Sequence, residues 1–426
     1  MNRPITLAIC GCGSRGLDAY PPYQKDHPEK MKIVAGADPR PGRLALLRER
    51  YGVAEDMCFA SDEELLAQPK LADAMLIATQ DRQHVPNALK ALEKGYHVLL
   101  EKPISPELSE CRQLLAKAKE TGKIVVVCHV LRYTPFYSTI KALIDNGDIG
   151  KLETIDAIEH VAYWHQAHSF VRGNWRRTDE TSPMILAKSC HDMDIFRWLA
   201  DGRCLKVQSF GALDHFRAEN APEGAPDRCL DGCPHADTCI FNAETIYITG
   251  KHCGIRNGKM GWPNNVVAAG VPTEEKLYEA LRTGPYGRCV YRCDNDVVDH
   301  QTVNMEFENN IHATFTMTAF TDQCHRTIKI TGTLGEIEGD METNTLTVRR
   351  FGKEVEVISL TDKEHAFAGH GGGDVRLVEQ FCEMVAGGGR SCLTSIDASV
   401  ESHVMALAAE ASRLRGGETI TLADFQ

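Results

Sequence analysis

The sequence predicts an α/β protein in which an N-terminal, doubly wound parallel sheet is followed by an α+β domain with a large, mainly antiparallel, open sheet. Three observations lead to this prediction. The chain has 426 residues, more than one hydrophobic core usually supports, so two domains are expected. Strand-like and helix-like segments alternate over the first 128 residues. After about residue 150 the pattern changes, and strands with period-two alternation recur.

The expected N-terminal domain covers residues 1–128. Its strands are short apolar runs: Ile5–Cys10, Lys32–Ala37, Ala74–Thr79, His97–Leu100 and Ile124–Cys128. Between them, apolar residues recur at helical spacing in Leu44–Tyr51, His84–Lys94 and Leu108–Glu120. Strands that alternate with helices are typical of a parallel sheet covered on both faces.

The expected second domain covers residues 129–426. Apolar and polar residues alternate in the strands that we expect at 302–307, 312–318, 327–331, 346–350 and 355–358. Two closing helices are expected at 374–384 and 397–414, the first capped by Asp374. Residues from about 214 to 299 are rich in Pro, Gly and Cys and are interpreted as an insertion.

Composition and charge restrict the class of partner. The 43% hydrophobic and 25% charged residues are ordinary for a globular protein, so global disorder is not expected. The net charge of −12 argues against nucleic acid or an anionic membrane surface as the main partner. The first apolar run is too short for a signal peptide, and no run approaches the length of a membrane span. We therefore expect a cytoplasmic protein that acts on a small molecule.

A glycine-rich loop follows the first expected strand. Its residues match G-x-G-x-x-G and are Gly11, Cys12, Gly13, Ser14, Arg15 and Gly16. Glycines there allow the tight turn and a close approach of the backbone to a pyrophosphate, and the following helix would attract the phosphate charge. Asp38 lies 22 residues past Gly16, where a carboxylate accepts hydrogen bonds from ribose hydroxyls. The pattern predicts a Rossmann domain that prefers NAD. NADP is the less favoured alternative, because Arg40 could recruit its 2′-phosphate.

A second motif, Glu101-Lys102-Pro103, follows the fourth expected strand, and residues 84–98 lead into it. With these residues the chain resembles the Gfo/Idh/MocA family of glucose-fructose oxidoreductase and inositol dehydrogenase, over nearly its whole length. The resemblance implies that Lys102 lies beside the nicotinamide and the reacting carbon. A lysine there would stabilise the developing alkoxide. Thr79, His84 and Glu101 are, by the same resemblance, further cofactor-binding residues.

The family's second signature is Asp, three residues, His, two residues and Asp on one helix. His191 and Asp194 match its second half, but Ala187 takes the place of the first acid and Lys188 follows it. Lys188 and His191 are three residues apart, so on a helix both would face the substrate. We expect His191 to be the acid/base, and Lys188 and Asp194 to bind substrate. The missing carboxylate means that the usual relay of Asp, His and Lys is not carried over intact.

Two segments before that helix concentrate aromatic and cationic side chains suited to a sugar ring and its hydroxyls. The candidate substrate-binding residues are Trp164, His165, His168, Trp175 and Arg176. Core packing and surface salt bridges are the alternative interpretation.

The insertion contains a cysteine cluster with the spacing C-x3-C-x5-C, formed by Cys229, Cys233 and Cys239. Fifty residues on, Cys289 supplies the fourth sulfur, with Cys293 as the alternative and Cys253 behind them. Four thiolates suit a closed structural zinc site, and an iron–sulfur cluster makes the same demand. Free or packed thiols are the competing interpretation.

The leading functional prediction is an NAD-dependent dehydrogenase that acts on a secondary hydroxyl of a sugar, polyol or glycoside. The first alternative is a glycosidase that keeps NAD bound and cleaves the glycosidic bond through transient oxidation and elimination. The second is a non-catalytic, ligand-sensing regulator, which the retained Lys102 and His191 argue against. The resemblance also implies a homo-oligomer, a dimer or tetramer, formed through the antiparallel sheet.

Overall fold

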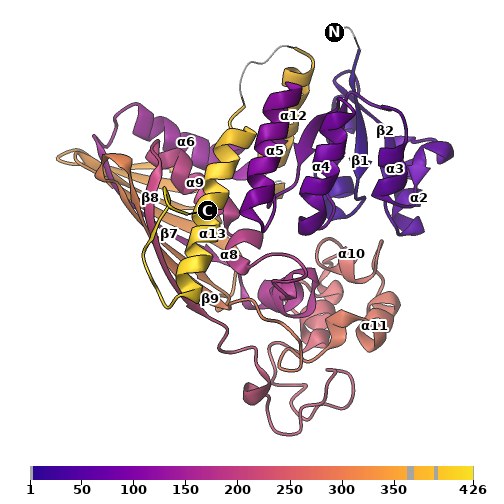
Figure 1. Ribbon diagram of the computed structural model, residues 1–426. Coiled ribbons are helices and arrows are strands. Elements are labelled where there is room, and N and C mark those ends of the chain that lie inside the picture. The colour runs from indigo at the N-terminus through magenta and orange to yellow at the C-terminus, as the bar shows by residue number, and fades with distance from the viewer. Residues whose placement is uncertain (1–2, 362–368, 388–391, 426) are drawn as a thin grey trace.

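The computed structural model describes residues 3–361, 369–387 and 392–425. Two sheets form its framework, and helices α5, α9, α12 and α13 lie between them (Figure 1). The helices are α1 Tyr23–Asp26, α2 Pro41–Tyr51, α3 Asp62–Ala67, α4 His84–Glu93, α5 Leu108–Thr121, α6 Pro135–Asp145, α7 Tyr163–His165, α8 Met184–Ala187, α9 Cys190–Ala200, α10 Asn264–Val267, α11 Glu274–Thr283, α12 Gly373–Val385 and α13 Ile396–Leu414.

The N-terminal sheet has six parallel strands in the order β3-β2-β1-β4-β5-β6. They are β1 Ile5–Cys10, β2 Met31–Ala37, β3 Cys58–Phe59, β4 Ala74–Ile77, β5 His97–Leu100 and β6 Val125–Val127. All four residues of β4 and all three of β6 are buried, because helices cover both faces of the sheet. The order reverses between β1 and β4, which confirms the doubly wound parallel sheet predicted from the sequence.

The helix expected after the glycine loop is shorter than the sequence pattern suggested. A single π-helical turn spans Arg15–Ala19, and the four-residue α1 follows it. Pro21 and Pro22 interrupt the segment, because proline lacks the N–H that would continue a helix. A phosphate at this loop would therefore depend on the loop amides more than on a long helix.

The second sheet has nine strands in the order β14-β13-β12-β11-β7-β10-β9-β8-β15. They are β7 Leu152–His160, β8 Cys204–Ala212, β9 His300–Phe307, β10 His312–Thr318, β11 His325–Gly332, β12 Gly335–Asp340, β13 Thr345–Arg350, β14 Glu356–Ser359 and β15 Ile420–Thr421. Only the β7–β10 pair is parallel. In β10 the residues Ala313, Phe315 and Met317 are buried, while their neighbours are more exposed. The predicted open, mainly antiparallel sheet is therefore confirmed, with one face toward helices.

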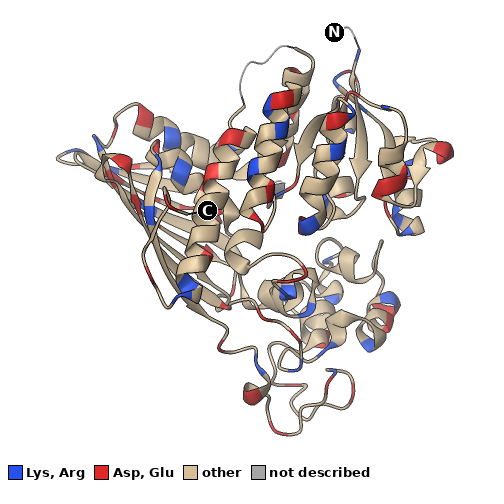
Figure 2. Cartoon of the chain, viewed as in Figure 1, with Lys and Arg blue, Asp and Glu red and all other residues tan. Residues whose placement is uncertain are grey.

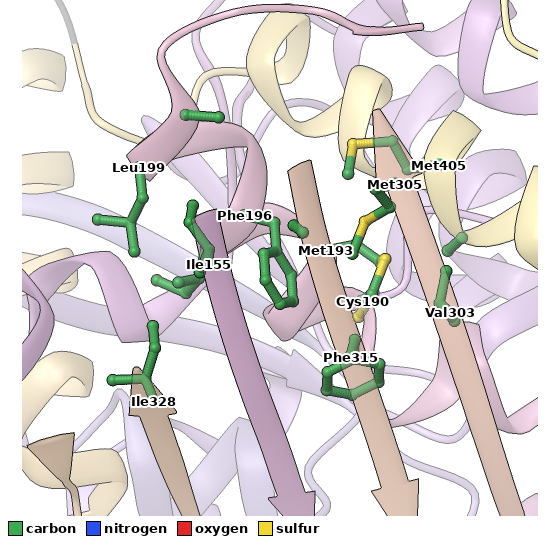
Figure 3. Packing of buried hydrophobic residues seen from close by; sticks show 14 of the residues in the cluster. Ile155, Cys190, Met193, Phe196, Leu199, Val303, Met305, Phe315, Ile328 and Met405 are labelled. Carbon is green, nitrogen blue, oxygen red and sulfur yellow. The ribbon is translucent and has the colours of Figure 1, made fainter. Parts of the chain in front are cut away.

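Helix α9 covers the inner face of this sheet. Its apolar side chains pack over β7, β9, β10 and β11, and Met405 of α13 closes the cluster (Figure 3). Helix α12 belongs instead to the core of the parallel sheet, where Leu377 and Phe381 pack with Leu7 and Ile9. The C-terminal helices thus join the two sheets into one body.

Asp374 does not cap α12 as expected. Gly372 is the N-cap residue, and Asp374 lies in the first turn with its carboxylate 2.8 Å from the Arg15 guanidinium. Arg15 of the glycine loop, distant in sequence, lies at the start of this helix. Its guanidinium attracts the Asp374 carboxylate, which therefore does not cap the helix.

The insertion builds a small core of its own, in which Phe216, Tyr247 and Leu277 are buried. With α10 and α11 it lies beside the edge of the parallel sheet (Figure 1). Figure 2 shows Lys and Arg interspersed with Asp and Glu over the helices of both domains. Among the described residues, no helix is long and apolar enough to cross a membrane.

Candidate active site

The carboxyl ends of the parallel strands gather most of the predicted cofactor-binding residues. The glycine loop follows β1, Asp38 follows β2, Thr79 follows β4, and Glu101 and Lys102 follow β5. Because parallel strands end at the same edge of a sheet, one edge presents all of these groups. In open α/β sheets this is the edge at which ligands bind, next to the point where the strand order reverses.

The glycine loop fits a dinucleotide. A Cβ on Gly16 would lie 1.9 Å from the carbonyl oxygen of Gly11, and one on Gly11 would lie 2.5 Å from that of Ala78. Gly13 differs, because a Cβ there would meet nothing closer than Arg40 at 3.9 Å. Gly11 and Gly16 are therefore required by packing, and Gly13 leaves an open approach to the backbone.

Asp38 is almost fully buried and accepts several hydrogen bonds. Its carboxylate receives the backbone N–H of Cys12 at 3.0 Å and the Arg40 guanidinium through two contacts of 2.9 Å. From the sequence, Arg40 was expected as the residue that could bind a 2′-phosphate. In the structure its side chain is instead held on Asp38.

Thr79 and His84 line the same edge. The Thr79 hydroxyl oxygen is buried and has no hydrogen-bond partner among the described residues. His84 lies between two carbonyl groups, with Nδ1 2.6 Å from the Pro103 oxygen and Nε2 3.1 Å from the Thr79 oxygen. His84 thus holds the turn after Lys102 against the turn after β4, and the Thr79 hydroxyl is left for a ligand.

Glu101 links the glycine loop to α12. Its carboxylate lies 2.6 Å from the Arg15 Nε, and Arg15 also pairs with Asp374. Burial works against the charge of Glu101, yet Arg15 and Lys102 hold the pKa of that carboxyl below its ordinary value. Glu101 therefore stays ionised and keeps the loop, the strand end and α12 together.

Lys102 reaches across to the second domain. Its ammonium group donates a hydrogen bond of 2.9 Å to the carbonyl oxygen of Ala187, at the end of α8. Ala187 is the position where the resemblance implies an acid. A backbone carbonyl therefore fixes Lys102 where a carboxylate is expected.

The expected helix through Lys188 and His191 is broken. α8 ends at Ala187 and α9 begins at Cys190, so Lys188 lies in the turn and shares no helical face with His191. The Lys188 ammonium is 3.1 Å from the carboxylate of Glu159 on β7. Glu159 is fully buried and also pairs with Arg326, which pairs in turn with Asp192. Lys188 thus belongs to a network of four alternating charges.

His191 lies on the first turn of α9 and is nearly buried. Its ring meets the ring of His129 edge-on, with centroids 5.8 Å apart. Neither ring nitrogen of His129 has a hydrogen-bond partner among the described residues. Burial, Arg132 and Lys102 hold the pKa of His129 well below its ordinary value, so this ring is neutral. His129 was not among the predicted site residues, although it follows β6 at the edge that carries Lys102.

The aromatic segment before α8 comes together with the insertion. His165 and His168 both contact the Trp262 ring, with centroid distances of 4.8 and 5.3 Å, and Trp164 lies 5.7 Å from it. Burial, followed by Lys188, His168 and Lys102, holds the pKa of His165 well below its ordinary value. These side chains therefore form a neutral aromatic wall close to two lysines. Trp262 was missed because the sequence offers no sign of how the insertion folds back.

Three predicted substrate-binding residues are engaged elsewhere. Asp194 forms a fully buried pair with Arg132, at 2.6 and 2.7 Å. Trp175 donates to Asp81 at 3.1 Å, and Arg176 pairs with Asp294 and Glu180 near the surface. For Arg176 these contacts match the salt-bridge alternative.

The predicted metal ligands Cys229, Cys233, Cys239 and Cys289 line one small cavity in the insertion. Cys293 and Cys253 do not line it. Within the described ranges, no three His, Cys, Asp or Glu side chains are already gathered closely enough to hold a metal ion.

Comparison with known proteins agrees with this architecture. Residues 5–129 match the model of an oxidoreductase family with an NAD-binding Rossmann fold, and residues 141–422 match the C-terminal α/β domain of the same family. A solved oxidoreductase from Agrobacterium radiobacter, in complex with NAD+, L-tartaric acid and magnesium, has a TM-score of 0.70. It is 15% identical, and the match covers 99% of both chains.

Curated relatives include the putative oxidoreductase YteT of Bacillus subtilis, 24% identical over 88% of each chain. The scyllo-inositol 2-dehydrogenase (NAD+) of the same organism is 29% identical over 50% of this chain and 59% of its own. The match to that dehydrogenase thus spans little more than half of it. From the two family models and the geometry of the site, the chain belongs to the Gfo/Idh/MocA family of oxidoreductases and is an NAD-dependent dehydrogenase.

Proposed function

We propose that the protein oxidises or reduces a secondary hydroxyl of a sugar, polyol or glycoside, with Lys102 and His191 at the reacting centre. One observation carries the proposal. Lys102, which follows β5, donates a hydrogen bond to the Ala187 carbonyl at the break between α8 and α9. Helix α9 carries His191. The lysine of the cofactor domain and the histidine of the second domain thus border the same region.

The cofactor would be held by the glycine loop, Asp38 and the Thr79 hydroxyl. When bound, NAD supplies the acceptor or donor of the hydride. We infer a preference for NAD over NADP because Asp38 is an acid at the ribose position and Arg40 is already bonded to it. A 2′-phosphate would meet this carboxylate, and the Arg40 guanidinium is already engaged with it.

Lys102 would stabilise negative charge as it develops on the substrate oxygen. The Ala187 carbonyl orients its ammonium group but cannot take a proton from it. We therefore assign proton transfer to His191, because an imidazole can both accept and donate a proton.

The neutral wall of Trp164, His165 and Trp262 would bind the substrate. Aromatic faces pack against the C–H faces of sugar and polyol rings, and imidazole nitrogens hydrogen-bond hydroxyls. The relatives named as inositol dehydrogenases support a polyol or sugar as the substrate class.

The test is an assay of the purified protein with NAD+ against polyols, free sugars and aryl glycosides, with NADH absorbance and aglycone release followed together. We expect NADH and a ketone product in equal amounts from a polyol or sugar. Aglycone release without net NADH would overturn the proposal in favour of a redox-assisted glycosidase.

We also infer that the chain forms a homo-oligomer through the outer face of the large sheet. A hollow of about 490 Å³ on that face is lined by residues of β7, β10, β11, β12 and β13, among them the exposed Ile158. Light scattering should give the mass of a dimer or tetramer, and a monomer mass would contradict the inference.

A further inference from the structure

The insertion carries a cluster of four thiols that the dehydrogenase reaction does not use. Cys229, Cys233, Cys239 and Cys289 surround a cavity of about 20 Å³. A volume of that size holds roughly one water molecule or a single ion. His235 and Tyr291 complete the lining.

The fold brings the fourth cysteine to the other three through backbone hydrogen bonds. Cys289 donates its N–H to the Asp227 carbonyl at 2.8 Å, and Cys229 donates to the Gly287 carbonyl at 2.9 Å. Two segments about sixty residues apart are thus held side by side. Cys293, the alternative fourth ligand, instead directs its thiol to the carbonyl oxygen of Cys289 at 3.3 Å.

A buried cation beside the cluster supplies an independent observation. Arg172 is only 1% exposed. Its guanidinium donates to the carbonyls of Arg288 and Phe241, each at 2.7 Å, and to the Cys229 sulfur at 3.5 Å. The Nη1 atom has no hydrogen-bond partner within the described part of the chain. No carboxylate in that part forms an ion pair with Arg172.

A buried guanidinium without an anion is unfavourable, since burying a charge requires a compensating partner. The side-chain partner of Arg172 is the Cys229 sulfur, 3.5 Å away, and Cys229 lines the cavity together with Cys233, Cys239 and Cys289. The groups around this cation that can carry negative charge are thus mainly sulfur atoms.

We propose that Cys229, Cys233, Cys239 and Cys289 bind a thiophilic metal centre as thiolates, and that its negative charge balances Arg172. One Zn²⁺ with four thiolates carries a net charge of −2, and each thiol releases one proton on binding. Since no three ligands are already gathered in the described residues, binding draws the thiols inward around the cavity. An iron–sulfur cluster shares this ligand chemistry, and the experiment separates the two.

The centre would be structural and would stabilise the aromatic wall formed by Trp164, His165, His168 and Trp262. Arg172 ends the π-helical segment Gln166–Arg172, which carries His168. The His168 ring stacks on Tyr286 of the insertion at 4.7 Å. A metal that holds Cys229 and Cys289 therefore fixes both sides of this contact. The inference does not depend on the identity of the substrate.

The test is the metal content of the full chain, purified anaerobically without chelators from cells supplied with zinc and iron. We expect about one zinc per chain, or about four irons with labile sulfide and visible absorption. Cys239→Ser and Cys289→Ser should lose most of the metal, while Cys293→Ser, outside the cavity, should keep it. A folded wild-type chain without metal, or equal losses in all three variants, would overturn the proposal.

A second measurement needs no cysteine variant. A mercurial reagent added stepwise to the wild-type protein should release the metal as about four thiols react. Arg172→Met should lose metal to a chelator at least about tenfold faster, as expected for a partner of the ligands. Thiols that react at once with no metal released would contradict the site even if the variants failed to fold.

Discussion

Lys102 departs from the related pattern in a single contact. Its ammonium group is fixed by the Ala187 carbonyl, where the related pattern has an acid. A carbonyl orients the lysine but accepts no proton, so the proton has to leave the reacting hydroxyl by another route. We propose that His191 takes this proton; its ring lies against the neutral ring of His129.

His403 is a second buried histidine whose protonation state follows from its contacts. Its Nε2 accepts the N–H of Ile104 at 2.8 Å, and Nδ1 lies 2.7 Å from the Ser399 carbonyl oxygen. The proton therefore lies on Nδ1 of a neutral ring. Burial, and then His129, lowers its pKa to about 3.

This shift predicts acid sensitivity. The unfolded chain takes up a proton near the ordinary histidine pKa of 6.5, whereas the folded chain does so only near pH 3. The unfolding free energy should therefore fall as pH drops from 6.5 toward 3, by at most about 1.4 kcal/mol per pH unit from this group. Urea unfolding at several pH values measures it. His403→Gln should flatten the slope and Ser402→Ala should not, and an unchanged slope in His403→Gln would refute the assignment.

At the scale of elements, the break between α8 and α9 positions the site. It turns the Ala187 carbonyl toward Lys102 and places the Lys188 ammonium group beside the Glu159 carboxylate. Helix α9 is anchored at Asp194, whose buried pair with Arg132 ties the helix to the segment after β6.

Breaking that pair should destabilise the fold. Asp194→Asn leaves the Arg132 cation buried without its partner, and we expect a loss on the order of 3–5 kcal/mol in unfolding free energy. Glu308→Gln, which removes one partner of the exposed Arg203–Glu308 pair, should cost much less, because water screens that pair. Denaturant unfolding of the two variants gives the comparison. Equal small losses would favour a substrate-binding role for Asp194.

The elements that the sequence predicted well are those set by local periodicity. The expected bounds of β1, β5 and β10 agree with the structure, because apolar alternation and turn residues define them. The turn at Lys188 was not predictable, since the attraction of Glu159 comes from a strand about thirty residues away. The pairing of Arg40 with Asp38 was likewise missed, because motif spacing does not show which way a side chain turns.

For the whole molecule, long-range contacts determine how the site is closed. Helix α12 completes the core of the N-terminal sheet, and Arg15 joins it to Glu101. The insertion folds back so that Trp262 contacts His165 and His168. Neither arrangement has a local signal, so sequence reasoning could not place them.

Trp262 should therefore affect substrate binding more than cofactor binding. In Trp262→Ala we expect KM for the substrate to rise about tenfold, because loss of a packed aromatic ring removes roughly 1.4 kcal/mol of binding free energy. NADH affinity should change little. Val271→Ala, at another exposed position of the insertion, is the matched control. A KM unchanged by Trp262→Ala would show that the insertion does not touch the substrate.

Lys102→Met tests most directly whether Lys102 acts at the reacting hydroxyl, through its effect on turnover and on NADH affinity with the best substrate of the panel. Lys119→Met, on the exposed side of α5, serves as control. We predict that turnover falls by roughly 10²–10⁴-fold, as for loss of a group acting on the reacting proton or oxyanion, while NADH affinity stays within about threefold. Turnover close to that of the control would show that Lys102 does not act at the reacting hydroxyl.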